Sequence, residues 1–462
     1  MFYERLSAKD TTFLRIETDH EPQHVGSLSV LDGAPLRDAD GRLRFDDLRA
    51  HIERRLHRVP RMRQRLMEVP FGQGRPVWVD DAHFDLDFHV RLTSIPRPGD
   101  DVQLATLMGR LQSLPIDRAR PLWEMWFVDG FADDDVGLVL KTHHALGDGI
   151  ANVDLALAIL DVGEETPDDG EPAPPWSPRP APTDEQLLRQ AVREYMTFPI
   201  RAADAAVRAL RDPLPAIETT TNAVRTAISF TSKPDDAPWN RDVSPHRRWV
   251  SADVPIGGVR AIRERFDVTL NDVVLTACTG ALRRFLVDHG ADVHDRTLQA
   301  MVPSSVRGED ERDDTRGTLI SVAVVELPVS EPDPARRLEL VHTATTEMKE
   351  SGSAAGADTI IEIADAITPL AGPLTRFVSQ QIPMNLVITN IPGPPMPLYF
   401  HGARMRRAYP YVEVVDHEGL TIAVLSYDDQ LFFGITSDRD VIPDLADVAR
   451  GIEAEFTLLR EL

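Results

Sequence analysis

The chain has 462 residues, of which 42% are hydrophobic and 27% charged, a composition typical of a soluble globular protein of two or three domains. Its 50 lysines and arginines stand against 74 aspartates and glutamates, and the formal net charge of −24 argues against nucleic acid as a partner, because phosphate binding needs a basic surface. The single cysteine, Cys278, excludes an intrachain disulfide and a cysteine zinc site.

The N-terminal half is predicted to alternate strands and helices. Residues 1–7 lack the basic and then apolar regions of a signal peptide, and no segment approaches about 20 consecutive apolar residues. We therefore expect a cytoplasmic protein. Apolar periodicity predicts strands at 24–31 and 136–142 and helices at 45–56 and 103–111.

A proline-rich segment divides the chain. Residues 167–182 hold too many prolines for a helix or a central strand, which predicts an extended, semi-rigid linker. The predicted organisation is an N-terminal domain at 1–165, a linker at 166–184 and a C-terminal domain at 185–462.

The region after the linker has the same mixed pattern, so the fold class is α/β. Helices are expected at 186–211 (broken at Pro199), 269–288 and 445–459. Strands are expected at 298–302, 319–327, 386–389, 420–426 and 431–436.

The main functional candidate is the stretch from His143 to Gly149, between the strand at 136–142 and a helical pattern at 150–160. Neighbouring side chains on a strand point to opposite faces, so only one of His143 and His144 can enter a given cleft. That histidine is a candidate general base, with Asp148 fixing the turn and Gly149 allowing an unusual backbone conformation. Two other interpretations remain open: a structural histidine pair with Asp148 as a helix cap, and a metal site.

Several common catalytic motifs are missing from the sequence. It contains no G-x-S-x-G nucleophile elbow, no phosphate-binding G-x-x-x-x-G-K-[ST] and no dinucleotide-binding G-x-G-x-x-G. The pair of glycines at 72 and 74 indicates a turn. A histidine base acting on a bound acceptor is the simplest remaining chemistry.

With these features in place, the chain resembles the bacterial wax ester synthase/acyl-CoA:diacylglycerol acyltransferase family over nearly its full length. The HHxxxDG stretch at 143–149 is shared by the wider superfamily of CoA-dependent acyltransferases. The narrower resemblance depends on further motifs in the family's order, namely Leu6-Ser7, His24-Val25-Gly26, Pro121-Leu122-Trp123, Asn271-Asp272, Val302-Pro303-Ser304-Ser305 and Asn390-Ile391-Pro392-Gly393-Pro394.

The resemblance implies two chloramphenicol-acetyltransferase-like domains with an active-site channel between them. It implies that His144 is the general base, His143 a supporting neighbour, Asp148 an organiser of the loop, and Gly149 part of the same motif. The substrates would be acyl-CoA and a diacylglycerol or long-chain alcohol, with no cofactor and no metal. The residues that bind CoA and the oligomeric state are unknown.

Secondary site candidates come from the same motifs. Asn271 and Asp272 would lie near the channel, although Thr269 and Asp272 also form a capping-box pattern. Pro121, Leu122 and Trp123 are packing residues that could line the acyl path. The helix at 186–211 is either a segment that contacts a membrane or lipid droplet, or a packed connection.

Two rival functions remain at this stage. One is a condensation-type enzyme that uses acyl groups bound to a carrier protein. The other is a non-catalytic protein that binds lipid or coats lipid droplets. The order of the family motifs argues against the first, and the intact His144 and Asp148 argue against the second.

Overall fold

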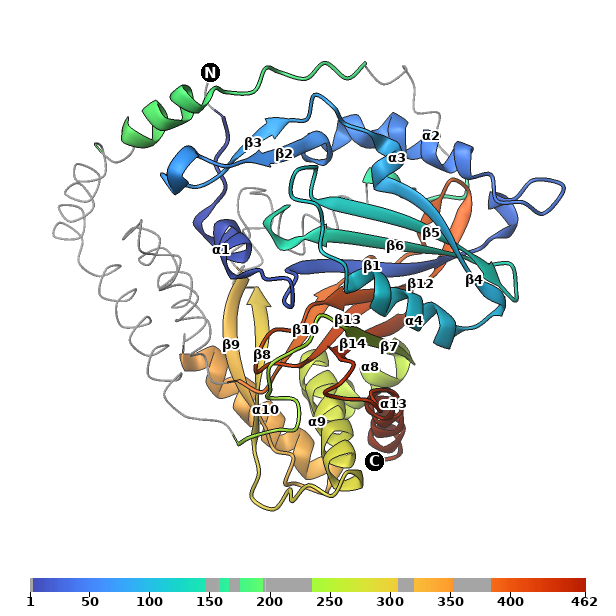
Figure 1. Ribbon diagram of the computed structural model, residues 1–462. Helices are drawn as coiled ribbons and strands as arrows, with labels where there is room; N and C mark the ends of the chain where they lie inside the picture. The colour runs from blue at the N-terminus through green and yellow to red at the C-terminus, as the bar shows by residue number, and fades with distance from the viewer. Residues whose placement is uncertain are drawn as a thin grey trace.

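The computed structural model describes residues 3–146, 156, 158–165, 175–193, 196, 235–305, 320–351 and 384–462. Two six-stranded mixed sheets form its framework (Figure 1). The first sheet has the order β11-β12-β1-β6-β5-β4. Its strands are β11 (Tyr399–Phe400), β12 (Ala403–Val412), β1 (His24–Leu31), β6 (Val136–His143), β5 (Trp123–Phe131) and β4 (Val90–Gly99).

The second sheet is built from residues after the linker, in the order β7-β14-β13-β10-β8-β9. Its strands are β7 (Arg247–Pro255), β14 (Gln430–Asp438), β13 (Leu420–Tyr427), β10 (Leu386–Pro392), β8 (Leu298–Ser305) and β9 (Ile320–Leu327). A small hairpin of β2 (Gln64–Met67) and β3 (Val77–Asp80) lies apart from both sheets.

The helices are distributed between the two halves. The first half has α1 (Ala8–Ile16), α2 (Phe45–Arg55), α3 (Leu86–His89) and α4 (Asp101–Gln112). The second has α8 (Ile256–Phe266), α9 (Leu270–Asp288), α10 (Pro334–Ser351) and α13 (Ala446–Glu461). Figure 1 shows α9, α10 and α13 together at the end of the molecule remote from the first sheet. No helix in the described part of the chain is both long and apolar enough to cross a bilayer.

The second sheet is covered on both faces. Leu431 and Phe433 of β14 pack into the core that contains α9 and α13, whereas Phe432 between them packs into the core of the first half. This is the alternation that a strand requires when both of its faces are buried. Strand β6 is buried at all eight positions, which explains its apolar run from Val136 to Leu140.

Most of the expected elements are confirmed with small changes at their ends. The predicted strands at 24–31 and 136–142 are β1 and β6, and the predicted helix at 269–288 is α9. Residues 184–193 are helical and residues 175–183 have neither helix nor strand, while the rest of 166–211 lies outside the described residues apart from Met196.

The chain also returns to the first sheet after it has entered the second. Strand β12 pairs along β1, and together with β11 it completes the first sheet from residues far beyond the linker. Helix α4 lies close to β7, and a Cβ at Gly109 would lie 2.8 Å from the Arg247 carbonyl oxygen. The two halves are therefore closely packed against each other.

Candidate active site

Three strand ends meet at one point of the first sheet. Strand β1 lies between β12 and β6, and its first residue, His24, pairs with His143, the last residue of β6. Strand β12 ends beside the same end of β1. The residues that follow β6 and β12, His144 and Glu413, are therefore brought together although 268 residues separate them in the sequence.

His143 is a buried structural residue. Its backbone N–H donates to the Leu122 carbonyl at 3.0 Å. The Nδ1 atom of its ring accepts a hydrogen bond from the Ala145 N–H at 2.9 Å, so the ring proton resides on Nε2, which lies 3.3 Å from Glu17 Oε2. Burial lowers the pKa of His143, and the ring is neutral at pH 7.

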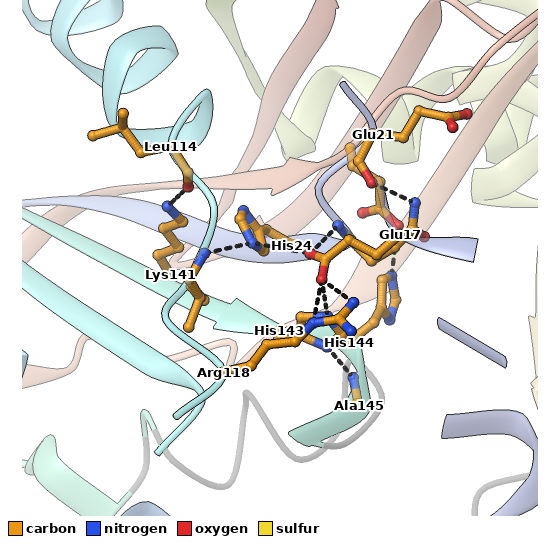
Figure 2. A network of polar contacts seen from close by, with 12 residues as sticks. Glu17, Glu21, His24, Leu114, Arg118, Lys141, His143, His144 and Ala145 are labelled. Atoms are coloured by element: carbon orange, nitrogen blue, oxygen red, sulfur yellow. Dashed lines mark hydrogen bonds and ion pairs between the residues drawn. The ribbon is translucent and has the colours of Figure 1, made fainter. Parts of the chain in front are cut away.

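Glu17 is the centre of a polar network behind the histidines (Figure 2). Arg118 Nε donates to Glu17 Oε2 at 2.7 Å, and the Gln23 N–H donates to Oε1 at 3.1 Å. Burial alone would raise the pKa of Glu17, but the hydrogen bond with His143 and the charge of Arg118 outweigh burial and lower it. Glu17 is therefore an ionised residue that links α1, β6 and the segment that carries Arg118.

A buried lysine fixes the segment that carries Arg118. The Lys141 ammonium donates to the carbonyls of Leu111 and Leu114 at the end of α4, and burial lowers its pKa to about 8. Two residues further on, the Ile116 N–H donates to His24 Nε2 at 3.2 Å. These contacts fix the backbone that leads to Arg118.

His144 has different surroundings. It begins a 3₁₀ turn, and 20% of its side chain is exposed, whereas the His143 side chain is fully covered. Its ring stacks on Phe13 with a centroid distance of 4.2 Å and an angle of 7°. Its Nε2 atom lies 3.1 Å from Glu413 Oε1. An accessible imidazole held in one orientation has the properties that proton transfer to or from a bound hydroxyl requires.

The predicted candidates in the PLW motif lie directly behind the histidine strand. The Leu122 carbonyl holds the His143 backbone, and Trp123 is buried, with its indole N–H donating to the Met62 carbonyl at 2.8 Å. Pro121 is buried as well. The structure supports the packing role that the sequence indicates for these three residues.

Asp272 is at the start of α9 in a complete capping box with Thr269. One of its carboxylate oxygens also contacts His342 Nδ1 at 2.8 Å, and the other accepts from the Thr345 hydroxyl at 2.6 Å. None of these contacts reaches the histidines. The capping interpretation is thus the one that the geometry supports, and its neighbour Asn271 is half-buried.

The predicted and the observed site do not contain the same residues. Asp148 and Gly149 lie outside the described residues. Glu17 and Glu413 were missed, since neither belongs to a motif that marks a catalytic carboxylate, and Glu413 reaches the site only through the pairing of β12 with β1. In the described part of the chain, no three His, Cys, Asp or Glu side chains are grouped as metal ligands.

Two family models match this chain. The model described as the wax ester synthase/diacylglycerol acyltransferase catalytic domain matches residues 6–274, and the corresponding C-terminal domain matches residues 316–460. The chain belongs to the wax ester synthase/diacylglycerol acyltransferase family. It is therefore an acyltransferase of this family, as its sequence motifs predict.

Individual relatives agree with this assignment. A Mycobacterium tuberculosis protein named probable diacylglycerol O-acyltransferase tgs1 is 32% identical over 456 residues, which cover 97% of this chain and 94% of the relative. The wax ester synthase/diacylglycerol acyltransferase structure from Marinobacter aquaeolei VT8 is 26% identical, with a TM-score of 0.70 and coverage of 99% and 100% of the two chains.

The fold extends beyond this family. The first condensation domain of the CDA synthetase is 16% identical to this chain, with a TM-score of 0.58 and coverage of 99% and 95%. At that identity the likeness concerns the fold alone. It confirms the expected α/β fold of two chloramphenicol-acetyltransferase-like halves.

Proposed function

We propose that this protein transfers a long-chain acyl group from acyl-CoA to the hydroxyl of a diacylglycerol or a long-chain alcohol, with His144 as the general base. The observation that carries this proposal is the different exposure of the two adjacent histidines. His143 is covered, with Nδ1 bound by the Ala145 N–H and Nε2 facing Glu17, whereas His144 is partly open to a substrate. The names of the relatives in the family support the choice of acceptors.

In the proposed step, His144 takes the proton of the acceptor hydroxyl as its oxygen attacks the thioester carbon. A C–O bond forms and the C–S bond breaks through a tetrahedral intermediate. The proton then passes from the imidazolium to the departing sulfur. The products are an ester and free CoA, so atoms and charge balance without a cofactor. Removal of the proton during attack is worth about 10²- to 10⁴-fold in rate in enzymes of this kind.

Asp148, Gly149 and the channel complete the proposal. Asp148 organises the loop after His144, and Gly149 allows the turn before the following helix. We place both substrates in a channel between the two halves of the molecule, with Asn271 near the channel. Support for the role of the motif comes from the hydrogen bond between the His143 N–H and the Leu122 carbonyl, which fixes the backbone from which the motif starts.

We also propose peripheral contact with a lipid surface, since the acceptors are insoluble in water. Support comes from apolar side chains that are open to solvent, with Phe71 87%, Val192 59% and Met196 73% exposed. Val69 beside the first of these packs with Leu187 of the helix at 184–193. Flotation with phospholipid vesicles that contain dioleoylglycerol checks this proposal: Phe71→Ser should reduce the bound fraction several-fold, and a wild-type protein that stays unbound contradicts it.

The catalytic proposal is tested with palmitoyl-CoA and either dioleoylglycerol or hexadecanol as acceptor, with CoA thiol release and product lipid as readouts. His144→Ala should lower the turnover number by about 10²- to 10⁴-fold. His294→Ala, at an 83% exposed side chain, is the matched control and should retain wild-type activity. Burial raises the pKa of Cys278 to about 12, so the enzyme's own thiol adds no background.

The result that contradicts this proposal is acceptor-dependent thiol release that survives His144→Ala at the wild-type rate. The preferred acceptor follows from the same assay. If neither acceptor supports release by the folded wild-type protein, a lipid-binding function replaces the proposed one.

A further inference from the structure

Glu413 is a carboxylate that the second half of the chain contributes to the site. Only 9% of its side chain is exposed, and Oε1 lies 3.1 Å from Nε2 of His144. Its other oxygen, Oε2, is buried and has no hydrogen-bond partner among the described residues. A buried carboxylate is costly to ionise unless a donor or a positive charge compensates it, and the group in contact with Glu413 is His144.

The fold fixes Glu413 in this position from two sides. It follows the last residue of β12, which pairs with β1, and its own carbonyl accepts from the Thr421 hydroxyl at 2.8 Å. Three residues further on, the Asp416 N–H donates to Glu21 Oε1 at 2.9 Å. The segment after β12 is thus attached both to the second sheet and to the segment before β1.

The charged groups around this pair have other partners. Arg247 of β7 lies 3.8 Å from Asp438 and donates to the His20 and Ser244 carbonyls. Glu17 is bound by Arg118 and faces His143. The positive charge that His144 acquires on protonation is therefore placed to interact with Glu413 rather than with the network behind it.

Tyr411, the other titratable neighbour on β12, is neutral. Burial raises its pKa well above that of an exposed tyrosine, and the nearby charge of Glu413 adds to this shift. Tyr411 therefore supplies no charge to the site at the pH of the reaction.

We propose that Glu413 is a positioning residue for catalysis, which holds the His144 imidazole in orientation and stabilises its protonated form. This inference depends on the proposed role of His144 as the base. The His144 Nε2–H donates to the carboxylate, which leaves Nδ1 as the nitrogen that takes the acceptor proton, and the imidazolium that results carries an N–H on both ring nitrogens. Phe13 fixes the ring plane by stacking, and Glu413 fixes its rotation within that plane.

The test compares Glu413→Gln and Glu413→Asp with the wild-type enzyme over a range of pH. The amide keeps the size of the side chain and removes its charge. Loss of a charge-assisted contact to the imidazolium should lower the turnover number by roughly 10- to 100-fold with little change in KM for acyl-CoA. The acid limb of the kcat/KM profile should move by about 1 pH unit to lower pH, because the protonated histidine loses its partner.

Glu413→Asp retains the charge at a shorter reach. It should recover part of the rate and keep the acid limb near its wild-type position, which a purely structural role of the side chain would not produce. If the glutamine variant unfolds, the aspartate variant tests the inference alone: an acid limb shifted as far as one pH unit would overturn it.

Glu418→Gln is the matched control, since it changes the same short segment. Burial and the neighbouring Glu21 raise the pKa of Glu418 to about 8, so at pH 7 the substitution exchanges one neutral group for another. Its rate and acid limb should match those of the wild-type enzyme. Equal shifts in Glu413→Gln and Glu418→Gln would overturn the inference.

Failure of this inference can be separated from failure of the proposed function. If His144→Ala abolishes turnover while Glu413→Gln keeps the wild-type rate and pH profile, the role of Glu413 is wrong and the base assignment stands. If His144→Ala remains active, both are wrong.

Discussion

His143 and His144 have the same side chain, and their surroundings alone give them different roles. His143 uses both ring nitrogens to hold the turn after β6 and to contact Glu17, and burial keeps it neutral. His144 is one residue further along, with an open ring edge and an aromatic face behind it. We infer that the doubled histidine supplies one base and one residue that shapes the turn, since a buried neutral ring cannot exchange protons with a substrate.

Asp272 belongs to a motif of the family, and its contacts are structural. Asp272→Ala should lower the free energy of unfolding by about 1–3 kcal/mol, because it removes the carboxylate half of the capping box of α9 and leaves the Thr345 hydroxyl of α10 with only the His342 carbonyl as acceptor. Chemical denaturation at pH 7 measures this loss. The remaining folded enzyme should retain the wild-type pH profile, and a shifted acid limb would instead place Asp272 in the chemistry.

The stabilisation by Asp272 also has a defined pH dependence. Burial raises the pKa of this carboxyl, but hydrogen bonds from Thr345, His342 and Thr269 outweigh burial and lower it below the usual 3.8. Since the folded pKa is the lower one, the stabilisation is complete above the unfolded value and is lost as the pH falls through the folded value. The difference in stability between wild type and Asp272→Asn should shrink below about pH 4.

At the scale of the elements, the sequence predicted those helices and strands whose positions depend on neighbouring residues. Strand β6 is apolar from Val136 to Leu140 because both of its faces are buried, and α9 begins where a Thr-x-x-Asp capping box satisfies its first N–H groups. The expected strands and helices were therefore confirmed to within a few residues at most ends. The strand end drew attention to the two adjacent histidines for the same reason, but the choice of His144 over His143 came from the resemblance to the family.

Strand β12 shows where local patterns stop being informative. Residues 403–412 alternate only in their first half and are then buried almost continuously, and the sequence did not mark them as a strand. Their pairing with β1 depends on contacts between residues almost 400 positions apart, such as Val25 with Val412. Glu413 could not be predicted as a site residue either, because its place beside His144 follows from this pairing and no sequence motif marks it.

At the scale of the whole molecule, the two halves depend on each other. We propose that the linker at 166–184 divides the chain in sequence into a domain at 1–165 and a domain at 185–462. In space, β11 and β12 complete the first sheet, and Gly419 and Trp239 join the segment after β12 to the second half through the Gly419 N–H and the Trp239 carbonyl. The polypeptide connection at the linker is therefore a minor part of what holds the halves together.

This dependence predicts the result of cutting the chain within the linker. A protease site inserted after Gly170 and cleaved in the folded enzyme should leave two fragments that elute together in size-exclusion chromatography and retain most of the acyltransferase activity. The pairing of β1 with β12 and the approach of α4 to β7 survive the cut, since neither involves the linker. Residues 1–165 produced alone should be inactive and prone to aggregate, because the edge of β1 is unpaired and Glu413 is missing. Fragments that separate without denaturant, or a folded and active 1–165, would show instead that each half is an independent domain.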